Sequence, residues 1–579
     1  MRVNVKKYNE LLQCNDDYSV VLKKILYKYQ GVSSLIIDFP TGIYHFYPDH
    51  AMSKELYVSN TVGSNLAYKE KKIGLLLEKM QNVTISGNNS LFIFHGKMTT
   101  WTFLDCKNVR IENLTIDYQV PTCVDIIVSP IDSYRLSVEI PLEYQYRIEG
   151  NKIYWISDYS PYTGEPYWQE CNEMAYTQVF KKDSQISYRT NNLLFDNLIE
   201  IVEVDKNKLI FTYSDSVKNI NGTTIYQMRQ TLRDHPGALI MESKNIVLEN
   251  LNINYLHGFG IVAQCSEDIE ISNCVFQAPS YSQRKTASYA DFLQISSCKG
   301  DISIHHNIFD NPHDDAINIH GTFLEVSEIL SKNKIKVSFM HEETAGFPNF
   351  FIGDEICFID KNTLVSKEDV FVIEDIEGPN GKESRGSEDC LRNIILTLDR
   401  DIPDYIRVNE FVVENKTLIP NVQIFNNEFV NIPTRGVLVT TSGKVDIYQN
   451  KFHKIEMPAI YISSDANNWY ESGNIKNVNI VNNVFVEQNH LQDKTYSIIK
   501  VEPIIKIVKP MDYVHKTLNI NHNLFYLKDG NVLNAKSVNE INLNDNTFYL
   551  TDYSSKKNKI EEMVKLYHCN MTEKNNYLE

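Results

Sequence analysis

Three aspartates and one arginine stand at spacings that match an internal repeat of the chain. Asp291 and Asp314 are 23 residues apart, and 23 is also the separation of equivalent asparagines in repeats further along. In a chain that coils with a constant period, residues one period apart lie on neighbouring coils. We therefore expect Asp291 one coil below Asp314, with Asp315 beside Asp314 and Arg435 one coil above Asp315.

Carboxylates gathered in this way could cleave glycosidic bonds. Such hydrolysis needs one carboxylic acid to protonate the leaving oxygen and one carboxylate to activate water or to attack directly. Crowding raises the pKa of one carboxyl group, and a neighbouring arginine keeps another ionised. The simpler alternative is that Asp314 and Asp315 form a solvated corner of the fold. Asp291 below the pair and Arg435 above it favour the catalytic interpretation.

Two histidines flank the aspartate pair. His313 precedes it, and the alternation of the following strand turns Asn318 and His320 outward with Asp314. Metal ligation by the two histidines would need a third ligand at a useful spacing, and the sequence offers none. We therefore expect no metal at these histidines, and we take His313, Asn318 and His320 as candidate substrate-binding residues.

A later segment, residues 465–473, adds further candidates for sugar binding. Trp469 could carry the apolar face of a sugar ring, or could equally be the buried end of a loop. Asp465 and Glu471 could accept hydrogen bonds from sugar hydroxyls. Arg435 completes the set of candidate substrate-binding residues.

The elements that must position these residues are short strands with a period near 23. Alternating apolar residues followed by Asn, one further residue and Phe recur in segments 301–309, 421–429, 444–452, 477–485, 517–525 and 539–548. Short β-branched segments at a fixed period predict a solenoid of parallel strands, whose neighbouring coils bury one continuous core. The recurring asparagines predict an internal amide ladder at a turn.

Two long stretches, 121–234 and 322–419, interrupt the period. They contain alternating strand patterns without the repeat signature, so we expect two small antiparallel β-domains inserted at corners of the coils. Apolar residues at helical spacing near 22–29 and 560–567 predict cap helices at both ends. The expected divisions are a cap helix and first coils in 1–120, the first insert in 121–234, the central coils with the aspartates in 235–321, the second insert in 322–419, the C-terminal coils in 420–552 and a tail or cap helix in 553–579.

Charge and composition exclude several classes of protein. The 579 residues carry 57 Lys and Arg against 74 Asp and Glu, so the net charge is −17, whereas nucleic acids and anionic membranes require a basic surface. No apolar run is long enough to span a bilayer, and the N-terminus lacks the apolar stretch of an export signal. We therefore expect no nucleic-acid or membrane partner, and a cytoplasmic location unless the chain is processed. The ten cysteines include no CxxC motif, and Cys265 and Cys298 are interpreted as reduced, buried thiols.

Several motifs resemble glycoside hydrolase family 110, the inverting α-1,3-galactosidases. The segment NPHDDAINIHG at 311–321 is similar to the core motif of that family. Further similar stretches follow the family's order between about residue 35 and residue 550; they are FPTGIYHFYP at 39–48, WTFLDC at 101–106, HGFGIV at 257–262, TRGVLVT at 434–440 and DANNWYESG at 465–473.

The resemblance implies an all-β fold, a right-handed parallel β-helix with two inserted small β-barrel domains. It also implies release of terminal α-linked galactose from an α-galactosyl glycan, of the blood group B type or linear Galα1-3Gal, without a cofactor. The implied catalytic residues are Asp291, Asp314 and Asp315. By analogy with the polygalacturonases, Asp314 would be the general acid, and the other two would position and deprotonate the attacking water. One departure is Phe292, where the family usually has a glycine.

Two other functions remain open at this stage. A hydrolase or lyase of an acidic polysaccharide would need basic residues along its groove, and the repeat places only Arg435 there. A non-catalytic glycan-binding solenoid would keep aromatic residues such as Trp469 but has no reason to gather three aspartates. The sequence also leaves open whether the chain forms a homo-oligomer.

Overall fold

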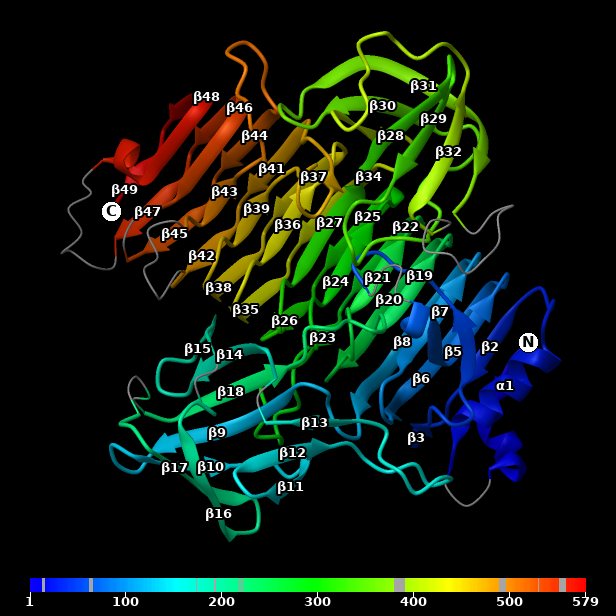
Figure 1. Ribbon diagram of the computed structural model, residues 1–579, viewed down its shortest axis with the longest axis vertical. Coiled ribbons are helices and arrows are strands. Elements are labelled where there is room, and N and C mark those ends of the chain that lie inside the picture. The colour runs from blue at the N-terminus through cyan, green and yellow to red at the C-terminus, as the bar shows by residue number, and fades with distance from the viewer. Residues whose placement is uncertain are drawn as a thin grey trace.

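Short strands with alternating burial stack into a parallel β-helix along most of the chain (Figure 1). The computed structural model describes residues 1–12, 16–61, 66–172, 174–191, 194–217, 220, 222–379, 391–488, 496–528, 531–550 and 559–579. Neighbouring coils pair in parallel, as β22 (Glu267–Ser272) does with β25 (Lys299–His305), and β25 with β34 (Pro420–Phe425). In these three strands the inward residues are buried and most outward residues are at least partly exposed, which is why the alternating repeat forms coils that need neighbours. The parallel β-helix expected from the repeat is confirmed.

The other strands of this sheet mostly pair in parallel with the coils beside them, and two short ones pair antiparallel. They are β1 (Arg2–Asn4), β2 (Leu35–Asp38), β3 (Ile43–Phe46), β4 (Met52–Glu55), β5 (Glu70–Glu78), β6 (Gln81–Phe94), β7 (Thr99–Leu104), β8 (Lys107–Tyr118), β19 (Ala238–Met241), β20 (Lys244–Ile253), β21 (Ile261–Gln264), β23 (Val275–Phe276), β24 (Leu293–Ser296), β26 (Ile308–Asp310), β27 (Ile317–Thr322), β35 (Glu428–Ile432), β36 (Val437–Thr440), β37 (Lys444–Tyr448), β38 (Lys451–Ile455), β39 (Ile460–Ile462), β40 (Glu471–Ser472), β41 (Asn477–Val481), β42 (Val484–Val486), β43 (Ile499–Val501), β44 (His515–Asn521), β45 (Leu524–Leu527), β46 (Leu533–Asn544), β47 (Thr547–Leu550), β48 (Val564–Lys574) and β49 (Tyr577–Leu578).

The recurring asparagines form an internal amide ladder, as the repeat predicts. Each side-chain amide donates to the side-chain oxygen of the next asparagine at 3.0–3.1 Å. The left-handed backbone that the turn requires belongs to the residue before the ladder position, for example Asn426 with φ 53° and Asn482 with φ 57°. The ladder satisfies buried polar groups that would otherwise destabilise the coil corners. Its members are Asn307, Asn427, Asn450, Asn483, Asn523, Asn546 and Asn576.

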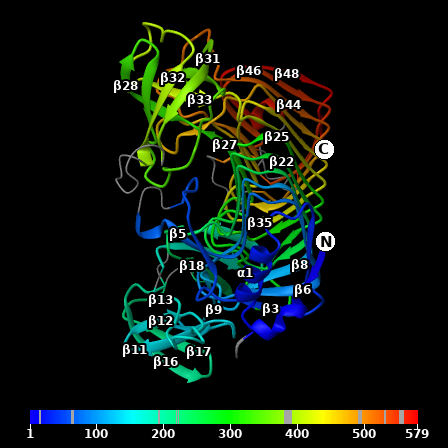
Figure 2. The same ribbon diagram turned by 90° about the vertical axis from the view of Figure 1, so that its right-hand side faces the viewer.

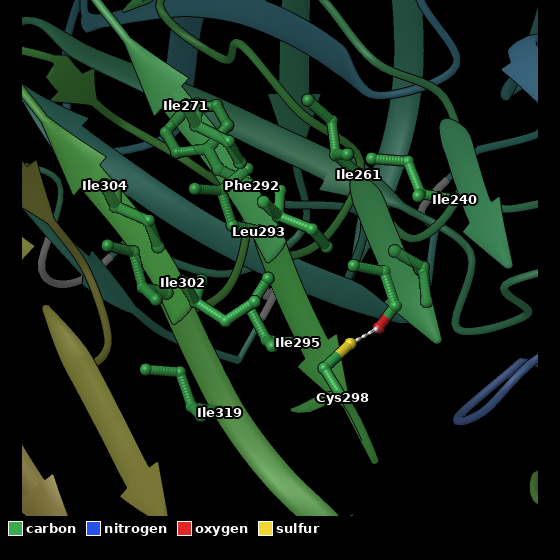
Figure 3. Close-up of a cluster of buried hydrophobic side chains, with 14 of the residues drawn as sticks. Ile240, Ile261, Ile271, Phe292, Leu293, Ile295, Cys298, Ile302, Ile304 and Ile319 are labelled. Carbon is green, nitrogen blue, oxygen red and sulfur yellow. Dashed lines mark hydrogen bonds between the residues drawn. The ribbon is translucent and has the colours of Figure 1, made fainter. Parts of the chain in front are cut away.

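Phenylalanines of the repeat stack in a second ladder inside the solenoid. Successive rings have centroids 4.6–5.1 Å apart, close to the spacing of neighbouring strands. Phe292, which replaces the glycine of the resembled family, is fully buried and points into this core (Figure 3). Its ring lies 5.2 Å from that of Phe276 and 6.0 Å from that of Phe309. The phenylalanine therefore contributes to core packing next to Asp291.

Two antiparallel domains project from the same side of the solenoid (Figure 2). The first contains a seven-stranded sheet in the order β15-β14-β18-β9-β10-β17-β16 and a three-stranded sheet β11-β12-β13, and the second contains a closed barrel in the order β28-β29-β32-β31-β30-β33. Their strands are β9 (Val124–Pro130), β10 (Arg135–Glu139), β11 (Gln145–Glu149), β12 (Lys152–Ile156), β13 (Gln169–Cys171), β14 (Tyr176–Lys181), β15 (Ile186–Arg189), β16 (Leu198–Asp205), β17 (Lys208–Tyr213), β18 (Thr224–Arg229), β28 (Leu324–Ser331), β29 (Lys334–Ser338), β30 (Glu355–Asp360), β31 (Ser366–Glu377), β32 (Asn393–Leu398) and β33 (Phe411–Asn415).

The two ends of the solenoid differ. At the N-terminal end, helix α1 (Tyr18–Lys28) is capped by Asp17 and buries Leu22 and Ile25. The short 3-10 turn η1 (Val5–Leu11) packs against α1, and a second one, η2 (Leu66–Tyr68), precedes β5. At the C-terminal end the expected helix is wrong, because only the 3-10 turn η3 (Ile560–Met563) forms before the chain continues as strand β48. Pairing of β48 with β46 satisfies its backbone along one edge and overrides the helical spacing. In the described part of the chain, no helix has the length and apolarity needed to cross a membrane.

Candidate active site

The three aspartates meet in one pocket between the two inserted domains. The pocket is a cavity of about 420 Å³. We call it the aspartate pocket; it is lined by Asn60, Tyr176, Arg189, Arg229, Thr231, Arg233, Phe259, Asp291, Asp314, Asp315, Asn318, Glu343, Arg435, Leu438, Trp469 and Glu471. The solenoid supplies its floor, and both inserts supply walls. Three carboxylates from two adjacent coils and a guanidinium from a third are therefore gathered in one place, as the repeat predicts.

The register of the coils differs from the expected one by one residue. Leu293 of β24 pairs with Ile317 of β27, 24 positions later, so the residue aligned with Asp291 is Asp315. The amide of Phe292 accordingly donates to the carbonyl of Asp315 at 3.1 Å. The expectation that Asp291 lies directly below Asp314 is wrong, because this coil has one residue more than the 23-residue period. Arg435 does follow Asp315 in register, 120 positions later.

Asp315 is fixed by a bidentate ion pair. Arg435 donates from Nε to Oδ1 at 2.9 Å, and its Nη2 lies 2.7 Å from Oδ2. The Arg435 backbone amide also donates to Oδ1 at 3.1 Å. Burial raises the pKa of Asp315, and Arg435 opposes that rise. Both oxygens of Asp315 are thus engaged, which suits a group that is held in a fixed orientation.

Asp314 is surrounded by guanidinium groups from the first inserted domain. Arg189 Nη2 lies 2.7 Å from Asp314 Oδ2, and Arg229 Nη2 lies 3.8 Å from the same oxygen. Burial opposes ionisation of Asp314, but Arg189, Arg435 and Arg229 together lower its pKa to about 2. The carboxylate is therefore ionised at any pH at which the protein is expected to work.

Asp291 has the opposite charge preference. Its exposed fraction is 3 %, and burial raises its pKa well above the ordinary value, with further rises from the charges of Asp314 and Asp315. Ionisation of Asp291 beside the carboxylates of the neighbouring coil is unfavourable, because like charges repel each other. Burial and the neighbouring carboxylates therefore favour the protonated form of Asp291, whereas the arginines favour the ionised form of Asp314.

The arginines of the first insert were not found from the sequence. Arg189 ends β15 and Arg229 ends β18, and their guanidinium carbons lie 4.6 and 4.4 Å from the ring centroid of Tyr176 on β14. The repeat register says nothing about residues outside the coils, so no signal in the sequence places these three side chains beside Asp314. Asn60, Arg233 and Glu343 were missed for the same reason.

His313 does not line the aspartate pocket. It is fully buried; Arg229 Nε donates to its Nδ1 at 3.1 Å, and its Nε2 donates to the carbonyl of Gln227 at 3.1 Å. Burial and the nearby Arg229 keep its pKa well below the ordinary value. The expected substrate contact is therefore wrong, and neutral His313 instead orients the guanidinium that faces Asp314.

His320 and Asp465 also stand outside the pocket lining. Nδ1 of His320 donates to the carbonyl of Gly321 at 2.8 Å. Asp465 accepts the backbone amides of Asn467, Asn468 and Trp469 at 2.8–2.9 Å, as residues at the start of tight turns do. Both expectations of direct substrate binding are wrong, because neither side chain lines the aspartate pocket and the Asp465 carboxylate is occupied by the backbone of its own turn.

Trp469 and Glu471 do face the pocket, on a loop that folds back against β27. The loop is held by pairing of Glu471–Ser472 with Gly321 and Thr322. Glu471 Oε1 accepts from Asn60 Nδ2 at 3.1 Å and from Asn318 Nδ2 at 3.3 Å. The Trp469 side chain is 43 % exposed, so the interpretation as a buried loop end is wrong.

The second insert supports the same wall. His341 stacks on Trp469 with centroids 4.3 Å apart, and Arg233, whose guanidinium lies 5.6 Å from the Trp469 ring, forms an ion pair with Glu343. Trp469 therefore presents a flat apolar face whose position is set by both the solenoid and the barrel domain.

One cluster of possible metal ligands lies among the described residues. The ligand atoms of Asp234, His235 and His257 are within 4.8 Å of one another. However, His257 Nε2 already donates to Asp234 Oδ1 at 2.7 Å, and Lys97 Nζ lies 3.7 Å from Asp234 Oδ2. The positive charge of Lys97 so close to Asp234 opposes the binding of a metal cation there. The cluster is better described as a buried ion-pair network behind Arg233.

Comparison with known proteins identifies the family. A model of the GLAA-B beta-barrel domain II matches residues 334–412. The alpha-1,3-galactosidase A of Streptomyces avermitilis is 38% identical over 508 residues, which cover 87% of this chain and 80% of that protein. The chain belongs to glycoside hydrolase family 110, the α-1,3-galactosidase family. The comparison thus confirms the family that the motifs of this glycoside hydrolase indicate.

Further relatives of this glycoside hydrolase are named either alpha-1,3-galactosidase A or alpha-1,3-galactosidase B. The alpha-1,3-galactosidase A of Bacteroides thetaiotaomicron is 34% identical over 92% of this chain and 89% of that protein. The alpha-1,3-galactosidase B of the same organism is 30% identical over 86% of this chain and 78% of that protein. Among solved structures, the catalytic unit of the GH87 alpha-1,3-glucanase from Streptomyces thermodiastaticus aligns with a TM-score of 0.40 and 10% identity, over 99% of this chain and 68% of that one.

Proposed function

We propose that this protein is an exo-acting α-galactosidase that removes terminal, non-reducing α-1,3-linked galactose with inversion of configuration. The observation that carries the proposal is the pair of oppositely biased carboxyl groups on adjacent coils, protonated Asp291 and ionised Asp314, inside a pocket of about 420 Å³. The names of the relatives supply the sugar and the linkage. A pocket walled by two domains favours attack at a chain end over attack within a polymer.

In this proposal Asp291 is the general acid and Asp314 the general base, the reverse of the assignment by analogy with the polygalacturonases. Arg189 and Arg229 both approach Asp314 Oδ2, which leaves Oδ1 to accept a proton from water. Inverting hydrolysis needs exactly one acid in the protonated form and one carboxylate in the ionised form. Asp315, engaged through both oxygens by Arg435, fixes the geometry between them.

The remaining lining residues suit a neutral sugar ring. The Trp469 face can carry the apolar C–H surface of galactose, and Glu471 keeps one carboxylate oxygen beyond the Oε1 that Asn60 and Asn318 hold. A terminal galactose of a blood group B type glycan or of linear Galα1-3Gal is the substrate we propose.

One observation supports a substrate with acidic sugars. Four arginines line the pocket, whereas the sequence predicted only Arg435 there. Each of the four is nevertheless in an ion pair with a carboxylate: Arg189 and Arg229 with Asp314, Arg233 with Glu343, and Arg435 with Asp315. A uronate would have to displace one of these carboxylates before it could be neutralised. We therefore favour the neutral substrate.

Hydrolysis of Galα1-3Gal followed by proton NMR tests the proposal. We expect β-galactose as the first product, which then mutarotates, and we expect Asp314→Asn to abolish its release while the far-UV circular dichroism stays unchanged. First appearance of α-galactose would refute inversion. Full activity of Asp314→Asn would refute the site, and cleavage of polygalacturonate in preference to Galα1-3Gal would favour the acidic substrate.

A further inference from the structure

A second cavity lies where the first inserted domain meets the outer face of the solenoid. It encloses about 650 Å³, more than the aspartate pocket, and shares no lining residue with it. Its walls come from β6 and β8 of the solenoid, from the turns around Leu142 and Asn207 of the insert, and from the loop at 279–284. We call it the outer cavity. The proposed hydrolysis does not use it.

Apolar surface is exposed around the outer cavity. Leu91 and Ile93 occupy outward positions of β6, where their neighbours on β8, Thr115 and Asp117, are polar. At the rim, the residues Leu142 and Tyr281 are each 81 % exposed. Tyr281 and Leu142 are thus exposed to water beside the outer cavity. A ligand ring with one apolar face could cover this surface.

Hydrogen-bonding groups are fixed in the same cavity. Arg284 is 3 % exposed, and its Nη2 donates to both oxygens of Asp117 at 2.7 and 2.9 Å. Its Nη1 is buried and has no hydrogen-bond partner among the described residues. A buried guanidinium nitrogen without a partner is costly, and a ligand oxygen would satisfy it.

Two carboxylates add acceptors. Glu143 accepts from Ser282 Oγ, and Glu139 Oε1 accepts from Gln283 Nε2 at 3.1 Å. Each contact uses one of the roughly four acceptor positions of a carboxylate. Asp117, Glu139 and Glu143 are balanced by Lys206, Lys208 and Arg284 in the cavity lining. The balance of three acids and three bases favours a neutral ligand over an anion or a cation.

We propose that the outer cavity is a second carbohydrate-binding site, which holds a neutral, hydroxyl-rich oligosaccharide with an apolar ring face against Tyr281 and its hydroxyls toward Arg284, Glu139 and Glu143. An apolar platform beside fixed donors and acceptors is the combination by which proteins bind sugars without charge. The proposal does not depend on the proposed hydrolytic function, because the two cavities are separate.

Lactose, a neutral disaccharide without an α-linkage to galactose, is the probe. Its dissociation constant is measured by saturation-transfer NMR on the full chain, and its inhibition constant against hydrolysis of an aryl α-galactoside reports binding to the aspartate pocket separately. We expect Tyr281→Ala to weaken lactose binding about three- to tenfold, the loss of one aromatic contact, while kcat/KM for the aryl galactoside is unchanged. Tyr27→Ala is the matched control, because Tyr27 on α1 is 80 % exposed but is not one of the residues that line the outer cavity.

Three results would overturn the second site. They are equal lactose affinity in Tyr281→Ala and wild type, a dissociation constant equal to the inhibition constant in both proteins, and preferential binding of digalacturonate over lactose. If the protein failed to cleave any α-galactoside, the proposed function would fall while the NMR titration still tested the second site.

Discussion

Removal of the Arg189 guanidinium gives a sharp test of how the charge of Asp314 is set. The pKa of Asp314 is lowered from 3.8 to about 2 although burial opposes this, which corresponds to about 2 kcal/mol in favour of the ionised form. Arg189 is the foremost of the arginines responsible and lies 2.7 Å from Oδ2. We expect Arg189→Ala to raise the pKa of Asp314 by about 1 or more, and not to restore it fully, because Arg435, Arg229 and Arg233 still favour the ionised form.

The sign of the effect on activity follows from the role of Asp314 as a base. A base works only when ionised, that is, above its pKa, so a raised pKa moves the loss of activity at low pH to a higher pH. In wild type we expect this loss to begin only near the acid limit of stability. In Arg189→Ala we expect kcat/KM to fall tenfold for each pH unit below about pH 3 to 4.

The assay is kcat/KM for an aryl α-galactoside as a function of pH, because this ratio reports ionisations of the free enzyme. Arg135→Ala is the matched control: Arg135 lies in the same inserted domain, and its partner Asp132 is on the exposed surface. Circular dichroism at each pH separates lost activity from lost fold. If Arg189→Ala lowered activity equally at every pH, with the acid limb where it is in wild type, Arg189 would not control the ionisation of Asp314.

Three further outcomes follow from contacts described above. Gly260→Ala should lower kcat more than about tenfold, because a Cβ atom there would lie 2.2 Å from the Asp291 carbonyl oxygen and would displace the acid; Gly31→Ala, where a Cβ meets nothing within 4 Å, should leave kcat unchanged. Asp291→Ala should abolish cleavage of Galα1-3Gal but spare much of the cleavage of an aryl galactoside whose leaving group needs no proton, and equal loss on both substrates would argue against Asp291 as the acid. Asn450→Ala should lower the free energy of unfolding in urea by about 2–3 kcal/mol, because it leaves buried ladder groups unpaired, whereas exposed Asn421→Ala should change it little.

The repeat made the coil part of the site predictable. Because stacked strands bring residues one period apart together, Asp291, Asp315 and Arg435 could be placed near one another from their positions alone. The exact neighbour of Asp291 could not, since a single extra residue in one coil shifts the alignment from Asp314 to Asp315. The ladder of Asn427 and its counterparts was also predicted correctly, because these asparagines recur at the same position of each coil.

Residues outside the coils could not be placed in this way. Arg189 and Arg229 reach Asp314 through the tertiary position of the first insert, which no spacing in the chain reveals. Asp465 has the residue type of a sugar ligand, but the turn that follows it takes its carboxylate first. The C-terminal segment around Val564 has helical spacing, yet an open strand edge on β46 offers it more hydrogen bonds as a further strand.

The placement of Asp291 and Asp315 on consecutive rungs has a consequence for how such a site can diversify. The vertical offset between their backbones is dictated by main-chain pairing, about 4.8 Å for any sequence, so side-chain substitution cannot tune it. Variation in the accepted substrate must therefore come from the rest of the pocket wall, that is, from the appended domains and the loop that carries Trp469, which can change while the scaffold preserves the spacing of the reacting groups.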